Sequence, residues 1–327
     1  MHQTSYLSGL LLSYMKEHPF TQPPQQLYEP IDYILGLGGK RIRPLLVLMA
    51  CNLYQEEVEA ALPAAHAVEI FHNFSLLHDD IMDNAPIRRG QPAVHVRYDV
   101  NTGILSGDVM LIYSYEYLLK SPTANAEQKV QLVSFFNQSA IEVCEGQQLD
   151  MNFENREDVE IAEYLKMIEL KTAALLSGAL RMGGLVGGAG EADLQSLDLF
   201  GRKMGIAFQL QDDLLDTYGD PAKFGKKVGG DIAQNKKTYL MLKAMERAGG
   251  PILDRLKGLM SDDTIDEAQK ISAVTEIYNS LDVRKATEEL QQRYMLEAFA
   301  ALDAVSVGDE RKKILKELAN RLLGRES

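Results

Sequence analysis

The sequence predicts an all-α protein. Apolar residues recur at the three- and four-residue spacing of helices, as at Ala64, Ala67, Phe71 and Phe74, whereas strict two-residue alternation is scarce. Hydrophobic residues make up 46% of the 327 residues, an ordinary share for a globular protein with a sizeable core. We find no run of about 18 uncharged apolar residues, so none of the helices is expected to cross a membrane.

The predicted helices are punctuated by glycines and prolines. Residues 1–16 hold an apolar cluster but lack the basic start and cleavage site of a signal peptide, and we expect a helix there. Gly36, Gly38 and Gly39 end a second helix, and Pro44 suits the first turn of the next. The downstream helices are expected at 24–37, 44–55, 58–84, 101–120, 126–152, 157–184, 191–218, 235–248, 263–279, 282–305 and 308–323.

Domain organisation and compartment follow from composition. A chain of this length often forms two domains, but no Ser- or Pro-rich linker divides it, so we expect one domain over residues 1–327, a bundle of antiparallel helices. The net charge of -13 argues against nucleic-acid binding and favours cation binding. Cys51 and Cys144 are the only cysteines and form no zinc-site spacing, which indicates free thiols in a cytoplasmic protein.

Two similar acidic clusters stand near predicted helix ends. Each follows an apolar run, and in each the first and last aspartates lie one helical turn apart on one face. A single cluster would be most simply explained as a solvated helix face, but two copies embedded in apolar helices favour metal binding, since Mg²⁺ prefers carboxylate oxygens. The clusters are Asp79, Asp80 and Asp83, and Asp212, Asp213 and Asp216.

Basic residues gather beside these clusters. Arginine suits bidentate phosphate recognition and lysine supplies a point charge, so the arrangement predicts binding of metal-bound anions. The glycine stretch before Lys40 lacks the Ser or Thr of a nucleotide-binding P-loop. The basic groups are Lys40, Arg41 and Arg43, then Arg88 and Arg89, and then Lys226, Lys227, Lys236 and Lys237.

The ordered motif set resembles the trans-isoprenyl diphosphate synthase (polyprenyl synthetase) family. The likeness runs from about residue 30 to 240 and implies the isoprenoid synthase fold, a helical bundle around a central cavity. The motifs that carry it are Gly38-Gly39-Lys40-Arg41-Ile42-Arg43-Pro44, His78-Asp79-Asp80-Ile81-Met82-Asp83, Arg88-Arg89-Gly90, Lys171-Thr172, and Gln209-Leu210-Gln211-Asp212-Asp213-Leu214-Leu215-Asp216.

The resemblance implies a role for each motif residue. It makes Asp79, Asp83 and Asp212 magnesium ligands, and Asp80, Asp213 and Asp216 their supporting partners in catalysis. Isopentenyl diphosphate would be held by Lys40, Arg43, His72 and Arg89. The allylic diphosphate would be held by Arg88, Lys171, Thr172, Gln209, Lys226 and Lys236, with Lys171 also catalytic.

The implied reaction is ionisation, condensation and proton elimination. About three Mg²⁺ ions and the basic set would stabilise the departing diphosphate. The family also implies a homodimer, and the helix over residues 101–120 is more apolar than one core face requires. Its apolar residues are Ile104, Leu105, Val109, Leu111, Ile112 and Tyr115.

Three other functions would also explain part of the motif set. A class I terpene cyclase would not need a second diphosphate site, and a non-catalytic subunit could lose its aspartates, of which this chain keeps all six. A di-iron protein would need two Glu-x-x-His pairs, and Glu69 to His72 gives one.

Product length should depend on the residues just before the first acidic cluster. Phe74 and Ser75 precede Asp79 by about one helical turn and should face the growing chain. In the family, one aromatic residue here without an insertion in the motif resembles the geranylgeranyl type. We therefore expect a C20 product, with C15 as the next choice, unless Phe74 merely packs between helices.

Overall fold

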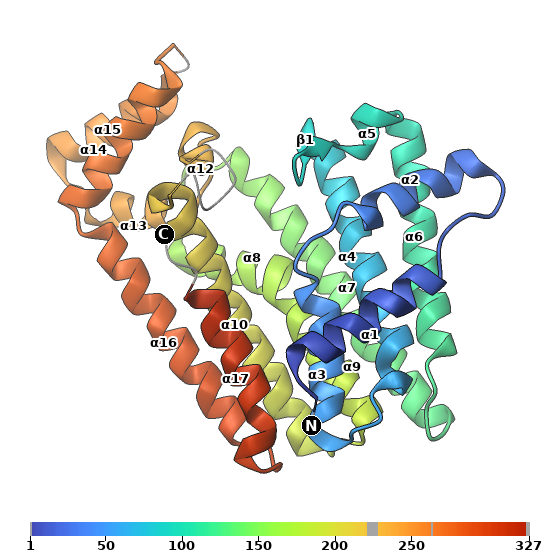
Figure 1. The fold of residues 1–327 in the computed structure, drawn as a ribbon. Helices are drawn as coiled ribbons and strands as arrows, with labels where there is room; N and C mark the ends of the chain where they lie inside the picture. The colour runs from blue at the N-terminus through green and yellow to red at the C-terminus, as the bar shows by residue number, and fades with distance from the viewer. Residues whose placement is uncertain (1, 221–227, 263, 325–327) are drawn as a thin grey trace. The chain divides into compact units, whose positions relative to one another are not determined.

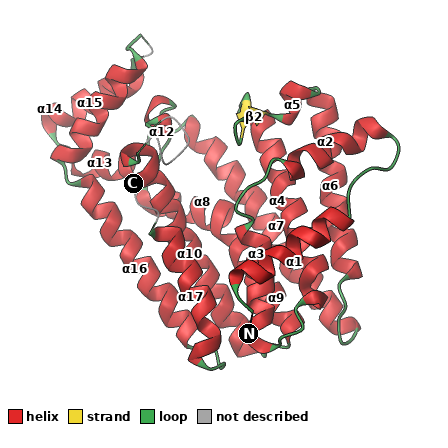
Figure 2. Cartoon of the chain, viewed as in Figure 1, coloured by secondary structure: helices red, strands yellow, loops and turns green. Residues whose placement is uncertain are grey.

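The computed structural model describes residues 2–220, 228–262 and 264–324. Helices dominate this part of the chain, which confirms the predicted all-α class (Figures 1 and 2). Most predicted helices agree with the observed ones within a few residues. The long helices are α1 (Thr4–Glu17), α2 (Gln25–Gly36), α3 (Ile42–Tyr54), α4 (Leu62–Met82), α6 (Val100–Lys120), α7 (Ala126–Glu154), α10 (Glu191–Tyr218), α15 (Glu267–Ser280), α16 (Val283–Asp303) and α17 (Asp309–Leu323).

One predicted helix, 157–184, is divided in the structure. It begins as α8 (Ile161–Ile168), continues through a π-helical turn, η2 (Glu169–Ala173), and resumes as α9 (Ala174–Gly187). The start is later than predicted because Glu160 and Glu163 form a reciprocal capping box that fixes the first turn. A π turn carries one extra residue, so it changes which side chains share a face.

Several shorter elements were not predicted from the sequence. Helix α14 (Gly250–Ser261) begins at a Gly-Gly-Pro stretch, where Pro251 sits in the first turn. The hairpin of β1 (Ile87–Arg88) and β2 (Gln91–Pro92) turns through Arg89 and Gly90, both at positive φ, 53° and 77°. Helices α5 (Val94–Arg97) and α12 (Gly230–Ala233) were also not predicted. The predicted helix 235–248 is observed as α13 (Tyr239–Arg247), and the start of the predicted helix 58–84 is a 3₁₀ turn, η1 (Glu59–Ala61).

Contacts divide the chain into two compact units. Unit 1 comprises Met1–Gln138, Gly178–Asp198 and Val305–Leu315, and unit 2 comprises Ser139–Ser177, Leu199–Ala304 and Lys316–Ser327. The expectation of one domain therefore stays a prediction.

Unit 1 is built on two buried helices, α3 and α4, with α6 packed along α4 (Figure 1). Every residue of α3 from Pro44 to Leu53 is buried, which is why its apolar residues do not form a single stripe. Glycine permits the close approach of α6 to α4: a Cβ built on Gly107 would lie 2.2 Å from His78 Nε2. This contact fixes the end of α4 that carries the first acidic cluster.

Unit 2 contains two hydrophobic clusters. One joins α8, α10, α13 and α16 through residues such as Ile168, Leu210 and Leu290. The other includes Leu214 of α10 and Tyr278 of α15. Helix α10 contributes to both, so the second acidic cluster stands on a well-packed helix.

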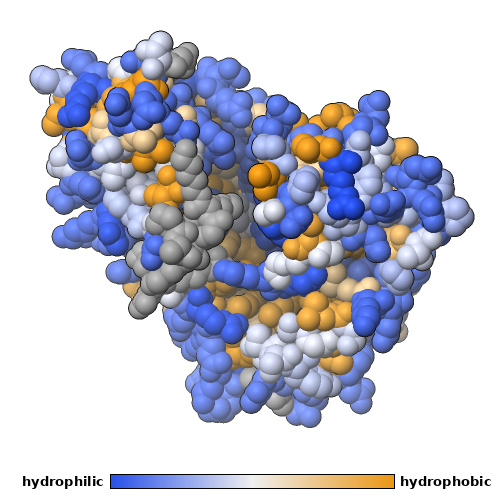
Figure 3. Space-filling view, turned by 45° about the horizontal axis from the view of Figure 1, so that its top comes forward, coloured by the Kyte–Doolittle hydropathy of each residue, from blue (hydrophilic) through white to orange (hydrophobic). Residues whose placement is uncertain are grey.

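Both polar and apolar residues lie on the surface of the molecule. Hydrophilic residues cover most of the face shown in Figure 3, and the hydrophobic residues on it form scattered groups. Among the described residues, no helix has the length and apolar character needed to cross a bilayer.

Candidate active site

The first acidic cluster lies at the C-terminal end of α4. Asp79 is in the last turn, and Asp83 is the residue at which the helix ends. Asp80 is buried and binds Arg88 of the hairpin, whose Nε donates to Oδ1 and Oδ2 at 3.0 and 3.1 Å. Burial raises the pKa of Asp80, and Arg88 opposes that effect. Arg88 Nη2 also lies 3.6 Å from Asp79 Oδ2, so the hairpin places a guanidinium against this cluster.

Three of the residues expected to bind isopentenyl diphosphate, Arg43, His72 and Arg89, lie near one another in unit 1. Arg43 Nη1 lies 3.2 Å from Nε2 of His72, and burial followed by Arg43 lowers the pKa of His72 well below its usual value. A neutral His72 accepts this bond, which orients the guanidinium. Arg89 donates to the carbonyl oxygen of Gly38, and a Cβ on Gly39 would lie 2.9 Å from its Cζ.

Backbone conformation brings these groups together. Gly38 and Gly39 have φ of 81° and 123°, and Arg41 and Arg89 adopt left-handed conformations with φ of 44° and 53°. Such conformations cost energy in residues other than glycine and cluster at functional sites. The double glycine is therefore required both for the turn into α3 and for the approach of the Arg89 guanidinium.

The second acidic cluster lies on α10 in unit 2. Asp213 is buried and accepts hydrogen bonds from the Tyr164 hydroxyl and from Gln209 Nε2, the latter at 3.1 Å. Burial, with Asp231 adding to it, raises the pKa of Asp213 to about 8. Asp216 Oδ2 accepts from the backbone N–H of Asp231 at 2.9 Å. These hydrogen bonds hold the side chains of Asp213 and Asp216 in place.

A cavity of about 120 Å³ opens beside this cluster. Lys171 Nζ lies 2.6 Å from Asp150 Oδ2, and the Thr172 hydroxyl donates to Gln209 Oε1 at 3.0 Å. Four residues expected at the allylic site, Lys171, Thr172, Gln209 and Lys236, line this cavity together with Asp150, Tyr164, Asp213, Asp231, Lys237 and Thr238. Of the two other residues expected at the allylic site, Lys226 lies outside the described residues and Arg88 belongs to unit 1.

The π-helical turn η2 sets the positions of Lys171 and Thr172. Helix α7 packs directly on it, because a Cβ on Gly146 would lie only 2.2 Å from the backbone nitrogen of Lys171. Asp150, four residues further along α7, adds an ion pair with Lys171.

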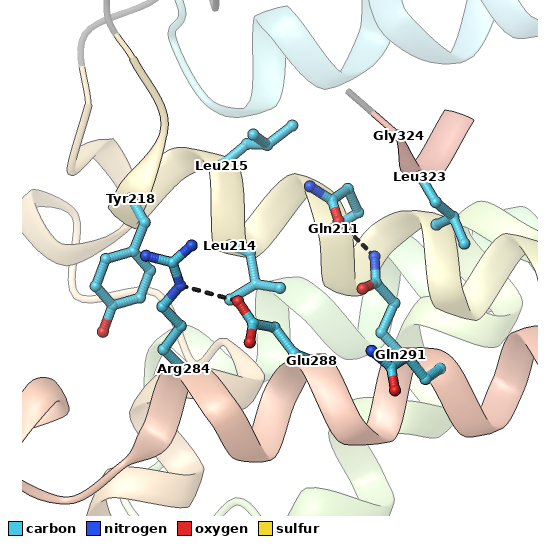
Figure 4. Close-up of a pocket in the computed structure, with 10 residues that line it drawn as sticks. Gln211, Leu214, Leu215, Tyr218, Arg284, Glu288, Gln291, Leu323 and Gly324 are labelled. Atoms are coloured by element: carbon cyan, nitrogen blue, oxygen red, sulfur yellow. Dashed lines mark hydrogen bonds and ion pairs between the residues drawn. The ribbon is translucent and has the colours of Figure 1, made fainter. Parts of the chain in front are cut away.

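A second, larger cavity lies on another face of α10. It has a volume of about 230 Å³ and is bordered by Gln211, Leu214, Leu215 and Tyr218 of α10 (Figure 4). Among its described lining residues the charged ones are Arg284 and Glu288, and these pair with each other at 2.9 Å. The smaller cavity is therefore the better candidate for the active site, because lysines and aspartates line it.

The aromatic residue before the first cluster belongs to a group of rings. The Phe74 ring centroid lies 4.8 Å from that of His78 and 5.5 Å from that of Phe71, and Phe71 in turn contacts Phe136 at 5.2 Å. The Ser75 hydroxyl donates to the backbone carbonyl oxygen of His72 at 2.8 Å. Phe74 thus has deeper aromatic neighbours within unit 1.

The aspartates of the two acidic clusters fit Mg²⁺ ions that are bound partly by the protein and partly by the substrate. In the described part of the chain, no group of three or more His, Cys, Asp or Glu side chains is arranged to hold a metal ion alone. Mg²⁺ bound through one or two carboxylates plus substrate phosphates needs no such group. The aspartates present only oxygen ligands, which are the hard donors that this ion prefers.

Tyr164, Asp150 and Asp231 were missed as site residues by sequence reasoning. Tyr164 looks like a core residue of an apolar helix, and its contact with Asp213 spans 49 positions of the chain. A weak signal existed for Asp231, which precedes the predicted Lys236 by five residues.

Comparison with known proteins agrees with this geometry. The family model described as polyprenyl synthetase matches residues 24–278. The chain belongs to the polyprenyl synthetase family. It is thus a prenyl diphosphate synthase, a transferase of the short-chain trans type, and has the all-α isoprenoid synthase fold. This membership decides against the terpene cyclase and the di-iron protein.

Individual relatives cover nearly the whole chain. A geranylgeranyl diphosphate synthase from Methanosarcina mazei is 37% identical over 94% of this chain and 92% of its own length. A geranylfarnesyl diphosphate synthase from Natronomonas pharaonis is 37% identical over 92% of this chain and 88% of its own length. A crystal structure of a geranylgeranyl pyrophosphate synthase superimposes with a TM-score of 0.94, at 42% identity and with complete coverage of both chains.

Proposed function

We propose that this synthase condenses an allylic diphosphate with isopentenyl diphosphate, with Mg²⁺ as cofactor, and forms geranylgeranyl diphosphate. The observation that carries the proposal is the unit 2 cavity, where Lys171, Thr172, Gln209 and Lys236 border the carboxylate of Asp213. A site that combines cations with a carboxylate cluster suits a diphosphate with its metal ions.

The chain's own residues would divide the work between binding and charge stabilisation. Lys171, steadied by Asp150, and Lys236 would hold the allylic diphosphate at the cavity. Mg²⁺ ions bound at Asp79 and Asp83 in unit 1 and at Asp212 in unit 2 would stabilise the negative charge of the departing diphosphate.

The second substrate would be bound in unit 1. Arg43, oriented by neutral His72, and Arg89, oriented by Gly38, would grip isopentenyl diphosphate together with Lys40. Exclusion of water by bound substrates would protect the allylic cation until the new bond forms. The motif residues offer no evident base, so the released diphosphate would take the proton.

The proposed C20 product rests on Phe74. One aromatic residue at this place, backed by Phe71 and Phe136, would stop the growing chain. Ser75 is small and already engaged with the backbone of α4. The relatives named above make products of the geranylgeranyl and geranylfarnesyl size, which supports a short-chain product; farnesyl diphosphate (C15) is the next choice.

We also propose a homodimer formed through α6. Leu105, Ile112 and Leu119 are exposed and recur every seven residues, so they lie along one face of that helix. Exposed apolar residues two helical turns apart form a stripe that can pack against the same stripe of a second copy. Light scattering at micromolar concentration should give the dimer mass, and a monomer mass would contradict this.

A cytoplasmic location completes the proposal. Cys51 and Cys144 are free thiols in the structure, which fits a reducing compartment.

One assay tests the function. The purified chain, given Mg²⁺ and an allylic diphosphate, should release diphosphate only when isopentenyl diphosphate is added. Mass spectrometry should identify a C20 product, and EDTA should stop the reaction. Release without isopentenyl diphosphate would indicate another reaction, and a product beyond C25 would contradict the proposed length.

A further inference from the structure

Glu69 is a buried carboxylate beside the arginines of unit 1, and nothing described above gives it a role. It lies on α4, ten positions before Asp79, and only 2% of its surface is exposed. Its Oε2 atom accepts no hydrogen bond from the described residues. A buried, incompletely satisfied carboxylate lowers stability, so its presence calls for a compensating interaction or a function.

A hydrogen bond and nearby positive charges compensate for this burial. Burial raises the pKa of Glu69, whereas the hydrogen bond from Asn73 and then the charges of Arg41, Arg89 and Arg43 lower it. The relation is mutual for Arg89: burial lowers the pKa of its guanidinium, as do Arg88 and Arg41, and Glu69 has the largest effect among the groups that raise it. Glu69 is thus the main counter-charge for a guanidinium that sits among other guanidinium groups.

Asn73 links Glu69 to Arg89 directly. It is fully buried, and its Nδ2 donates to the backbone oxygen of Glu69 at 2.8 Å and to Oε1 at 3.0 Å. Because these atoms are acceptors, the amide must turn its NH₂ toward Glu69 and its oxygen away from it. That oxygen lies 3.5 Å from Arg89 Nη1, a long contact that adds to the bond from Nη1 to the Gly38 carbonyl.

We infer that Glu69 and Asn73 are positioning residues that hold the Arg89 guanidinium in the orientation that binds the diphosphate of isopentenyl diphosphate. The inference rests on the proposed function of this site. A guanidinium surrounded by like charges would otherwise move outward to solvent, and a preorganised one loses less entropy when it binds phosphate. Neither residue needs to touch the substrate.

Two substitutions test the inference. Asn73→Leu removes the acceptor for Arg89 at similar volume, and Glu69→Gln removes the charge while keeping an acceptor for Asn73. Each should raise KM and the directly measured Kd for isopentenyl diphosphate by about tenfold, with KM for the allylic substrate within about twofold of the wild type. Should Asn73→Leu fail to fold, Glu69→Gln decides alone.

The sign of the Glu69→Gln effect discriminates between two roles. If Glu69 only repelled the bound anion, its neutralisation would tighten binding of isopentenyl diphosphate. Tighter or unchanged binding would therefore overturn the inference, as would an equal loss for both substrates.

A matched control and a double-mutant cycle separate positioning from general destabilisation. Asn52 is also fully buried and hydrogen-bonded, on α3, so Asn52→Leu should lower the melting temperature without changing either KM. In an Arg89→Ala background, Asn73→Leu should no longer change the Kd for isopentenyl diphosphate. A persisting effect would show that Asn73 does not act through Arg89. Failure of the wild type to condense the substrates would instead refute the proposed function.

Discussion

Asp213 should make the metal-free protein less stable as the pH rises. Its pKa is about 8 in the folded protein because of burial, against about 3.9 for an unfolded aspartate. The folded state therefore holds the proton more tightly, and the stabilisation present below about pH 4 is lost as the pH rises to about 8. Asp213→Asn, which imitates the protonated form, removes this dependence.

The size of the effect follows from the two pKa values. Each pH unit within the window is worth about 1.4 kcal/mol, so the variant should gain roughly 1–2 kcal/mol over the wild type at pH 5 and roughly 5 kcal/mol at pH 8. The Tyr164 hydroxyl and the Gln209 amide can both bond to an asparagine, so little of this gain should be lost to unmade hydrogen bonds.

Chemical unfolding followed by circular dichroism, in EDTA at pH 5 and pH 8, measures the gain. Asp158→Asn is the control: this carboxylate is exposed, and its hydrogen bond from Arg156 lowers its pKa, so the control should not gain stability as the pH rises. If the difference between Asp213→Asn and the wild type is the same at both pH values, the assignment of a buried, destabilising charge to Asp213 is wrong.

Four further substitutions address the metal site, the product and the packing. Asp79→Ala and Asp212→Ala should each abolish turnover in saturating Mg²⁺ without lowering the melting temperature, since each relieves repulsion within an acidic cluster; retained activity would contradict the metal assignment. Phe74→Ala should lengthen the products seen by mass spectrometry. An unchanged product distribution would mean that the Phe74 ring does not stop the growing chain. Gly146→Ala should destabilise the fold by about 1–3 kcal/mol in thermal unfolding and slow turnover, because the new Cβ would overlap the backbone of Lys171. Full stability would show that α7 can move aside.

Local patterns predicted the helices well because burial repeats with the helical period. The range 191–218 matches α10 at both ends, and 101–120 differs from α6 by one residue. Errors occurred where a local signal had two meanings. No helix was predicted between residues 248 and 263, yet Gly249, Gly250 and Pro251 begin α14 there, because proline suits a first helical turn.

The candidate site was predictable only as far as its residues form motifs. Asp79, Asp80 and Asp83 were identified by their spacing, and Lys171 and Thr172 by their resemblance to a family motif. Tyr164 was not identified, because its partner Asp213 lies 49 positions away in the chain. Glu69 was not identified as a positioning residue, because the arginines near it come from other parts of the chain. A buried carboxylate such as Glu69 resembles any helix glutamate until its neighbours are known.

The π-helical turn at Glu169–Ala173 makes the length of this segment a determinant of function. One residue deleted there would convert the turn to an ordinary α-helix, and every side chain on one side of it would rotate by about 100° relative to the other. Lys171 would then no longer line the same cavity as Gln209, although no functional residue had been substituted. A sequence alignment would treat this one-residue deletion as minor. In the structure, however, it would change which side chains face the cavity along the rest of the helix.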